Sequence, residues 1–320
     1  MNPRISVIII TYNRVQLLVE TLQQLLSDPY QPKEIIVIDN HSTDDTGQIL
    51  TRQFGDRILY KRMERNLGVP GGRNEGVKLA TGDILFFIDD DAVLMPNGLE
   101  KVARKFQDNP RLGIFSAKVI NFYTGQLDHS SWVYSIHRLK DQNIPFRSYK
   151  FVGGASAISR AVFDQCGYFW DRLFFMHEEI DLSLRALDKG FEIWYYPDVV
   201  VYHKLNSTGR MGISSRFFEY GTGNMVWIHF RYYPVWLALL RNLYFLFFNF
   251  LSAMRSGNVP AYGRGLRRCV AGITLPFKER WKISWQTIRE VQQLKKVRKD
   301  SVFKRAKRVL GIEKFNYENI

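Results

Sequence analysis

Short apolar runs alternate with segments of helical periodicity through the first 125 residues. Ile5–Ile10 is a continuous apolar run, as expected for a strand that is buried on both faces of a sheet. Residues 15–27 then carry apolar side chains at helical spacing, and strand-like runs return at residues 34–38 and 84–88. This order of strands and helices predicts an α/β fold with a mostly parallel sheet, flanked by helices and joined by right-handed crossovers.

Polar side chains follow three of the predicted strands, at the point where each strand ends. Because the carboxyl ends of parallel strands meet at one edge of a sheet, we expect these groups to lie together. Any one group is also ordinary turn or helix-cap chemistry, whereas three groups at one edge indicate a binding site. The groups are Thr11, Tyr12, Asn13 and Arg14, then Asp39, Asn40, His41 and Ser42, then Asp89, Asp90 and Asp91.

The third group is a run of three aspartates directly after the apolar strand Ile84–Ile88. Carboxylates this close repel one another, and an apolar sheet behind them raises the cost. A divalent cation makes the arrangement favourable, and oxygen ligands suit Mg²⁺ or Mn²⁺. The alternative is a solvated turn after a buried strand, and the triplet alone does not decide between the two.

The net charge of +14 is concentrated near the carboxyl terminus, since residues 254–320 hold 17 lysines and arginines against five acidic residues. A basic segment favours an anionic partner, either a phospholipid surface or a nucleic acid. The preceding residues 225–254 are strongly apolar, but His229, Arg231 and Arg241 interrupt them. A spanning helix needs roughly 20 apolar residues, so we expect helices that lie in a membrane plane or pack as a core.

Cysteine content and the amino terminus indicate the compartment. The two cysteines, Cys166 and Cys269, form neither a disulfide framework nor a zinc-site pattern. The chain runs from Met1 directly into its first strand without a signal-peptide pattern. We therefore expect a reduced, cytoplasmic setting.

Several spaced motifs between residues 4 and 210 together resemble the family 2 glycosyltransferases, which have the GT-A nucleotide-sugar-binding fold. The stretch at His203 and the apolar, basic tail are similar to the rhamnosyltransferase-type enzymes that build bacterial surface polysaccharides. The motifs are Val7–Arg14, Val37–Asp44, Asn66–Gly76, Asp89–Asp91, Gly153–Ala155, Glu178–Arg185 and His203.

The resemblance implies a GT-A catalytic domain over residues 1–224, with nucleotide-sugar binding in 1–125 and acceptor binding in 126–224. Residues 225–320 would form a helical, amphipathic and basic extension that associates with a membrane. The resemblance also implies a Mg²⁺ or Mn²⁺ site. Its ligands would be Asp91, His203 and Asp89, with Asp89 alternatively contacting the ribose or a metal-bound water.

The resemblance assigns the acceptor chemistry to the acidic cluster at 178–181. The second acidic position of this motif takes the proton from the acceptor hydroxyl, which maps to Glu179. Asp181 would orient the helix start or bind the acceptor, and Arg185 would pair with it at i+4. Without the resemblance, the same cluster is a dipole-favoured first turn of a helix. The nucleotide-sugar-binding residues would be Thr11, Tyr12, Asn13, Asp39, Asn40, Gly68, Gly72, Arg73, Asp89 and Asp90.

The implied function is inverting transfer of a sugar from a nucleoside-diphosphate sugar, with dTDP-rhamnose among the donors, to a glycan or lipid-linked acceptor. The protein would attach peripherally to the inner face of the cell membrane through residues 225–320, and no nucleic acid is expected as a partner. One alternative is a sugar-nucleotide pyrophosphorylase-like enzyme, although Thr11–Arg14 is not the glycine-rich basic loop that such an enzyme needs. The other is a non-enzymatic protein whose basic tail, with Trp281, Trp285 and Phe303, binds nucleic acid or membrane.

Overall fold

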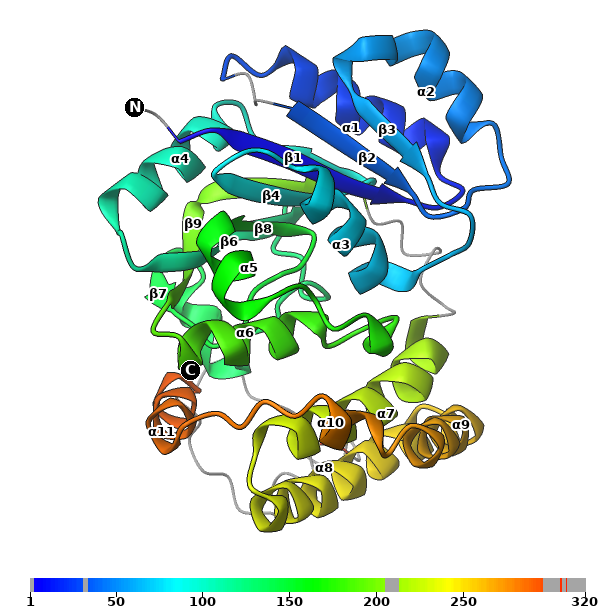
Figure 1. Cartoon of the computed structure of the whole chain (residues 1–320), viewed down its shortest axis with the longest axis vertical. Helices are drawn as coiled ribbons and strands as arrows, with labels where there is room; N and C mark the ends of the chain where they lie inside the picture. The colour runs from blue at the N-terminus through cyan, green and yellow to red at the C-terminus, as the bar shows by residue number, and fades with distance from the viewer. Residues whose placement is uncertain (1–2, 31–33, 205–212, 296–305, 307–308, 310–320) are drawn as a thin grey trace. The chain divides into compact units, whose positions relative to one another are not determined.

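The computed structural model describes residues 3–30, 34–204, 213–295, 306 and 309. The chain divides into two compact units (Figure 1). The first comprises Met1–Tyr134, Asp141–Phe174 and Glu178–Leu205, and the second comprises Ser135–Lys140, Phe175–His177 and Asn206–Ile320. The main division between the two units falls at Leu205.

The first unit is built on one sheet with the strand order β3-β2-β1-β4-β8-β6-β9-β5, and β7 pairs with β9. β1 runs parallel to β2 and β4, and β2 runs parallel to β3. The expected α/β architecture is confirmed. The strands are β1 (Ile5–Thr11), β2 (Glu34–Asp39), β3 (Leu59–Arg62), β4 (Ile84–Asp89), β5 (Ala92–Leu94), β6 (Leu112–Asn121), β7 (Phe146–Arg147), β8 (Ala155–Ser159) and β9 (Glu192–His203).

The second half of the sheet mixes parallel and antiparallel pairs. β8 is antiparallel to both β4 and β6, while β6 is parallel to β9. β9 is a single long strand of 12 residues. Its register against β6 shifts between Tyr196 and Val200, where Pro197 supplies no backbone N–H for the ladder.

Helices flank this sheet (Figure 1). In α1 the residues Val15, Leu18, Leu22 and Leu25 are buried, as their helical spacing predicts. α3 begins at Gly68. The helices are α1 (Val15–Ser27), α2 (Thr46–Phe54), α3 (Gly68–Leu79), α4 (Gly98–Asp108), α5 (Arg160–Cys166) and α6 (Glu178–Asp188).

The second unit is helical over its described residues. α8 is long and apolar enough to cross a membrane by length and composition, and 33% of its most apolar window is buried. Length and composition alone do not separate a membrane helix from a core helix. The helices are α7 (Ile213–Tyr232), α8 (Val235–Arg255), α9 (Val259–Ala271), α10 (Leu275–Lys278) and α11 (Trp285–Leu294).

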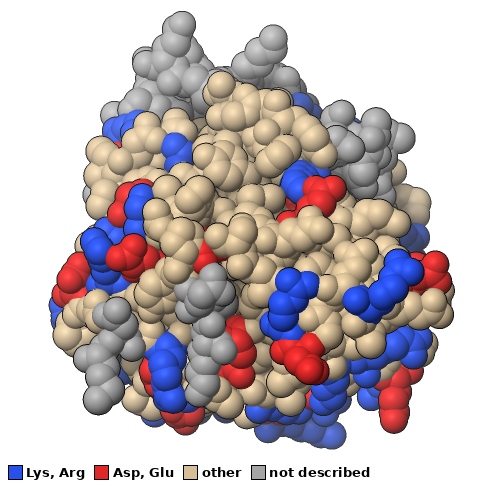
Figure 2. Space-filling model, turned by 90° about the horizontal axis from the view of Figure 1, so that it is seen from above, with Lys and Arg blue, Asp and Glu red and all other residues tan. Residues whose placement is uncertain are grey.

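Charged side chains of both signs are interspersed on the face shown in Figure 2. They lie mainly around its margin, and the centre is largely uncharged. The described residues of this face therefore present no continuous basic stripe of the kind that a nucleic-acid backbone requires.

Candidate functional site

Three side chains that the sequence analysis grouped as metal ligands lie together at the carboxyl ends of β4 and β9. Asp89, Asp91 and His203 each place one ligand atom within 4.8 Å of the others. Nε2 of His203 lies 3.1 Å from Oδ1 of Asp91, and this buried oxygen accepts no hydrogen bond from the described residues. Two carboxylates and an imidazole that converge with open acceptor capacity fit a divalent cation.

Asp128, from the loop after β6, holds the histidine in place. Its Oδ2 lies 3.0 Å from Nδ1 of His203. Burial opposes the charge of Asp128, but hydrogen bonds from His203, Ser130 and Ser131 hold its pKa below the usual range. A carboxylate bound to one imidazole nitrogen directs the other nitrogen toward a metal. Sequence analysis missed Asp128, because the unpatterned loop of residues 126–150 gave no signal.

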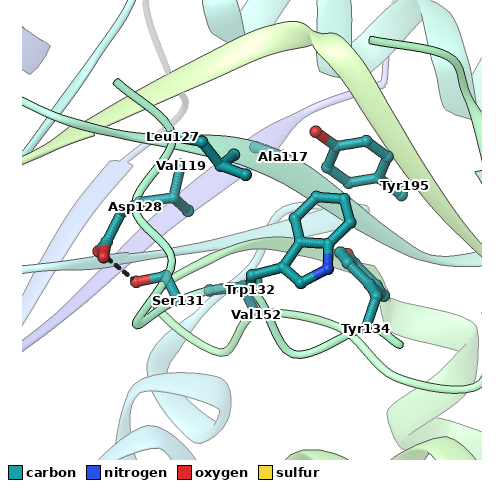
Figure 3. A pocket seen from close by; sticks show the side chains of 9 residues that line it. All are labelled: Ala117, Val119, Leu127, Asp128, Ser131, Trp132, Tyr134, Val152 and Tyr195. Atoms are coloured by element: carbon teal, nitrogen blue, oxygen red, sulfur yellow. Dashed lines mark hydrogen bonds between the residues drawn. The ribbon is translucent and has the colours of Figure 1, made fainter. Parts of the chain in front are cut away.

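Asp128 also lines a small cavity whose side chains Figure 3 displays. Asp128 and Ser131 lie at one end of the cavity, joined by a hydrogen bond of 2.6 Å. The Trp132 ring lies nearer the other end, close to Tyr134 and Tyr195. Asp128, which orients His203, therefore lies in the same loop as the aromatic side chains of Trp132 and Tyr134 and lines the same cavity.

Burial lowers the pKa of His203, but the neighbouring carboxylates of Asp128 and Asp91 outweigh that effect and raise it to about 9. The imidazole therefore favours its protonated form at neutral pH. A metal ion that binds at Nε2 would have to displace that proton.

We expect Asp128→Asn to weaken metal binding by roughly 10–100-fold, because the amide keeps the shape but removes the charge that orients His203. Titration of Mn²⁺ by calorimetry would measure the change. Asp108→Asn, at an exposed position at the end of α4, is the matched control and should bind Mn²⁺ as the unaltered protein does. Equal affinities for the two variants would contradict the role of Asp128.

Arg14 and Thr11 engage the other aspartate of the triplet. Oγ1 of Thr11 donates to Asp90 at 2.7 Å, and Nη1 of Arg14 lies 3.3 Å from Asp90 and 2.9 Å from Asp91. Burial raises the pKa of Asp90 to about 7, against the opposing charge of Arg14. Asp90 is thus directed toward β1, whereas Asp89 and Asp91 face His203.

A second acidic cluster lies at the start of α6, where Arg73 of α3 bridges two glutamates. Nη1 of Arg73 lies 3.0 Å from Glu178 and 3.3 Å from Glu179. The Glu178 side chain is 3% exposed and that of Glu179 is 23% exposed. Burial and the neighbouring Glu179 carboxylate raise the pKa of Glu178, against the opposing charge of Arg73. The exposed fractions make Glu179 the more accessible carboxylate.

Gly153 and Gly154 connect the two acidic clusters. A Cβ atom on Gly154 would lie 2.0 Å from Oδ2 of Asp89, and one on Gly153 would lie 2.2 Å from Oε1 of Glu179. A side chain at either position would displace the Asp89 or the Glu179 carboxylate. The two glycines allow the metal-ligand carboxylate and the acidic pair to approach the same stretch of backbone.

Asp181 and Arg185 form a buried pair behind this cluster, as their i+4 spacing predicted. Their side chains lie 2.6 Å apart and are 0% and 3% exposed. Arg185 also donates to the carbonyls of Cys166, Gly167 and Tyr168. Full burial leaves Asp181 no surface for an acceptor, so its contacts fit the alternative of orienting the helix start.

Asp181→Ala should destabilise the fold by about 3–5 kcal/mol, because it leaves the buried guanidinium of Arg185 without its counter-charge. Glu100→Ala is the control, since Glu100 and Arg104 form an exposed i,i+4 pair at 2.6 Å that is worth at most about 1 kcal/mol. Urea unfolding of both variants gives the comparison. A similar loss in both would contradict the structural role of Asp181.

Asp39 lies at the carboxyl end of β2 and is fully buried. Its Oδ1 accepts from the Ser42 amide at 2.7 Å, and its Oδ2 accepts from the Tyr60 hydroxyl at 2.7 Å. The turn contact that the sequence analysis weighed as an alternative is thus present. Each oxygen has a further lone pair for a ligand. Tyr12 nearby is 46% exposed, and Asn13 accepts from the Thr43 amide at 2.7 Å.

Three other expected donor-binding residues make structural contacts within the first unit. The Asn40 side chain donates to Asn66 and Gly68 and accepts from the Leu67 amide. Gly68 has a φ of +71°, and a Cβ there would lie 2.1 Å from the Phe174 carbonyl oxygen. Gly72 packs α3 against β1, since its Cβ would lie 3.0 Å from the Ile10 side chain. These contacts position α3 and the loop before it.

Comparison with known proteins agrees with this geometry. The family model for glycosyl transferase family 2 matches residues 6–167. An uncharacterized glycosyltransferase, YwdF of Bacillus subtilis, is 26% identical over 61% of this chain and 75% of its own. The GalNAc(5)-diNAcBac-PP-undecaprenol beta-1,3-glucosyltransferase of Campylobacter jejuni is 33% identical over 32% of this chain. That alignment spans only 34% of the relative's own length.

Solved structures share the fold at low sequence identity. GalNAc-T7, solved with UDP, GalNAc and Mn²⁺, superposes with a TM-score of 0.62 at 16% identity, over 91% of this chain and 57% of that one. The mannosyltransferase PcManGT of Pyrobaculum calidifontis, solved with GDP-Man and Mn²⁺, gives a TM-score of 0.57 at 18% identity, over 92% of this chain and 79% of that one. Because the family model matches just over half of its length, this chain belongs to glycosyl transferase family 2.

Proposed function

We propose that this protein is a metal-assisted, inverting glycosyltransferase. It moves a sugar from a nucleoside-diphosphate sugar to a hydroxyl group of a glycan or lipid-linked acceptor. One observation carries the proposal. Asp89, Asp91 and His203 lie together, Arg73 contacts Glu179, and both Asp89 and Glu179 lie against the backbone of Gly153 and Gly154. A diphosphate site and a proton acceptor at one place are what a single displacement at an anomeric carbon requires.

Asp91, His203 and Asp89 would hold Mg²⁺ or Mn²⁺, which supplies charge stabilisation for the leaving diphosphate when bound. Glu179 takes the proton from the acceptor hydroxyl. The acceptor oxygen bonds to the anomeric carbon as the bond from that carbon to the diphosphate oxygen breaks, and the nucleoside diphosphate leaves. One displacement inverts the stereocentre, so no carboxylate is needed as a covalent nucleophile, unlike in a retaining glycosidase.

The remaining residues at the sheet edge would bind the nucleotide. Asp39 at the end of β2 would accept from a pyrimidine N–H or a sugar hydroxyl, with the half-exposed Tyr12 beside it as an apolar wall. Thr11, Asn13 and Asp90 would shape the same pocket. Arg73, which was expected to contact the diphosphate, is buried against Glu178 and Glu179, so we assign it to positioning the base.

The names of two relatives support the proposed acceptor class. One is named as acting on a polyprenyl-diphosphate-linked glycan and another as a glucosyl-dolichyl phosphate glucuronosyltransferase. We accordingly place this protein at the cytoplasmic face of the cell membrane. Rhamnose stays a proposed donor sugar that rests on the resemblance of the His203 stretch.

A donor screen tests the proposal. UDP-, dTDP- and GDP-sugars, with dTDP-rhamnose among them, are incubated with the protein and a polyprenyl-linked glycan acceptor, with and without Mn²⁺. Released nucleoside diphosphate and the anomeric configuration of the product are measured. We expect metal-dependent release with one nucleotide class and inversion at the anomeric centre. Retention of configuration, or pyrophosphate release from a nucleoside triphosphate and sugar phosphate, would contradict the proposal.

A further inference from the structure

Helix α8 of the second unit carries its largest apolar side chains on the outside. Six of these residues are between 38% and 69% exposed. At about 100° per residue they fall on roughly one third of the helix circumference. This surface, called here the apolar face of α8, consists of Trp236, Leu239, Leu240, Leu243, Phe247 and Phe250.

The opposite side of α8 is buried and partly polar. Oδ1 of Asn242 lies 2.5 Å from Nδ1 of His229 on α7, and the Asn249 amide donates to Thr222 at 2.8 Å. The helix thus directs two asparagines into the unit together with Phe248, whereas the six large apolar side chains of its apolar face point out of it. This distribution is the reverse of that in a helix whose outer side faces water, so a partner must cover the apolar face.

The charges of α8 and of the segment that follows it in the same unit indicate which partner it is. α8 contains no acidic residue. Between residues 255 and 295 the exposed charged side chains are cationic, and the two acids there, Glu279 and Glu290, are half-buried. A second copy of this chain would bring like charges together around the contact, whereas an anionic bilayer would neutralise them. The exposed cations are Arg255, Arg264, Arg267, Lys278, Lys282 and Arg289.

A pair of tryptophans adds to the same surface. Trp236 and Trp285 stack with ring centroids 6.2 Å apart, and they are 57% and 53% exposed. Tryptophan favours the boundary between acyl chains and headgroups, because its ring is apolar and its N–H is polar. The pair joins the amino-terminal end of α8 to that of α11.

We propose that the apolar face of α8 inserts into the surface of an anionic lipid bilayer, with the helix axis in the membrane plane. α8 has 21 residues and would reach about 31 Å, enough to span the hydrocarbon core. Spanning is nevertheless excluded by its packing. α7 and α9 lie against it and carry Glu219, Arg264 and Arg267, which would enter the hydrocarbon together with the buried side of α8.

Vesicle binding tests the inference on the full-length chain. Binding is read without turnover, so its failure and a failure of the proposed sugar transfer are distinguishable. The double variant Leu240→Glu/Leu243→Glu, at positions 58% and 69% exposed, is compared with Ile144→Glu at a 57% exposed position of the first unit. Vesicles of phosphatidylcholine with and without phosphatidylglycerol are sedimented with each protein, after circular dichroism has verified that the variants are folded.

We expect the unaltered protein and Ile144→Glu to sediment with the phosphatidylglycerol vesicles, and the double variant to bind about 100-fold more weakly. Lys278→Glu/Lys282→Glu should weaken binding to the anionic vesicles and make it less sensitive to salt. Failure of the unaltered protein to sediment at low salt would overturn the inference. Equal binding by the double variant, with a dimer-to-monomer change in solution, would also overturn it and identify the face as a protein interface.

The depth of the helix is measured with brominated lipids. Bromine near the headgroups should quench the fluorescence of Trp236 and Trp285 strongly. This quenching should be lost in the Trp236→Phe/Trp285→Phe variant. A single tryptophan is then placed in that variant, first at Leu243 and then at Phe250. If bromine at all depths of the bilayer quenched the fluorescence of these tryptophans, α8 would be a spanning helix. That result would contradict the in-plane orientation.

Discussion

Glu179→Gln is expected to lower turnover by roughly 10²–10⁴-fold, the range measured for removing a general base. Glutamine keeps the size of the side chain and the contact with Arg73, 3.3 Å away, but cannot take a proton from the acceptor. Donor binding should change little, because the nucleotide contacts proposed here lie at the carboxyl ends of β1, β2 and β4. Single-turnover transfer and calorimetric titration of the donor would separate the two effects.

Glu178→Gln is the matched control for this prediction. The Glu178 side chain is 3% exposed, against 23% for Glu179, so an acceptor hydroxyl cannot reach it as readily and its loss in turnover should be much smaller. If Glu178→Gln lost turnover while Glu179→Gln kept it, Glu178 would be the general base. Weakened donor binding in Glu179→Gln would instead indicate a role in holding the donor.

Asp91→Ala is expected to abolish metal-supported donor binding and turnover together. It removes the carboxylate oxygen that lies 3.1 Å from Nε2 of His203. It also removes the contact of 2.9 Å between Asp91 and Arg14, so that Arg14 keeps only its ion pair with Asp90. A cation that stabilises a leaving diphosphate contributes several kcal/mol, so the loss should be on the order of 10³-fold or more.

Mn²⁺ titration followed by donor titration would check this expectation in the unaltered protein and the variant. Asp164→Ala, an exposed aspartate on α5, controls for the loss of one negative charge and should keep both affinities. Full activity of the unaltered protein in excess EDTA would contradict the metal requirement. Intact donor affinity in Asp91→Ala would show that the nucleotide is held without the metal site.

Local patterns in the sequence were sufficient for the first half of the sheet. The continuous apolar run of β1 and the helical spacing of α1 each depend on residues within a few positions, and both elements formed as predicted. The carboxyl ends of β1, β2 and β4 then meet because parallel neighbours align, which brings Thr11 and Asp90 within 2.7 Å. The i+4 pair of Asp181 and Arg185 is local in the same sense.

Contacts between distant segments were decided only by the tertiary structure. Asp128 contacts His203 across 75 positions and Arg73 contacts Glu178 across 105, and no local pattern records such distances. The antiparallel insertion of β8 between β4 and β6 likewise depends on pairing partners far along the chain. Sequence alone determined the elements of the first half of the sheet and the chemistry at their ends. The fold decided which carboxylates have charged partners, since burial and charge pairing depend on every segment that packs around them.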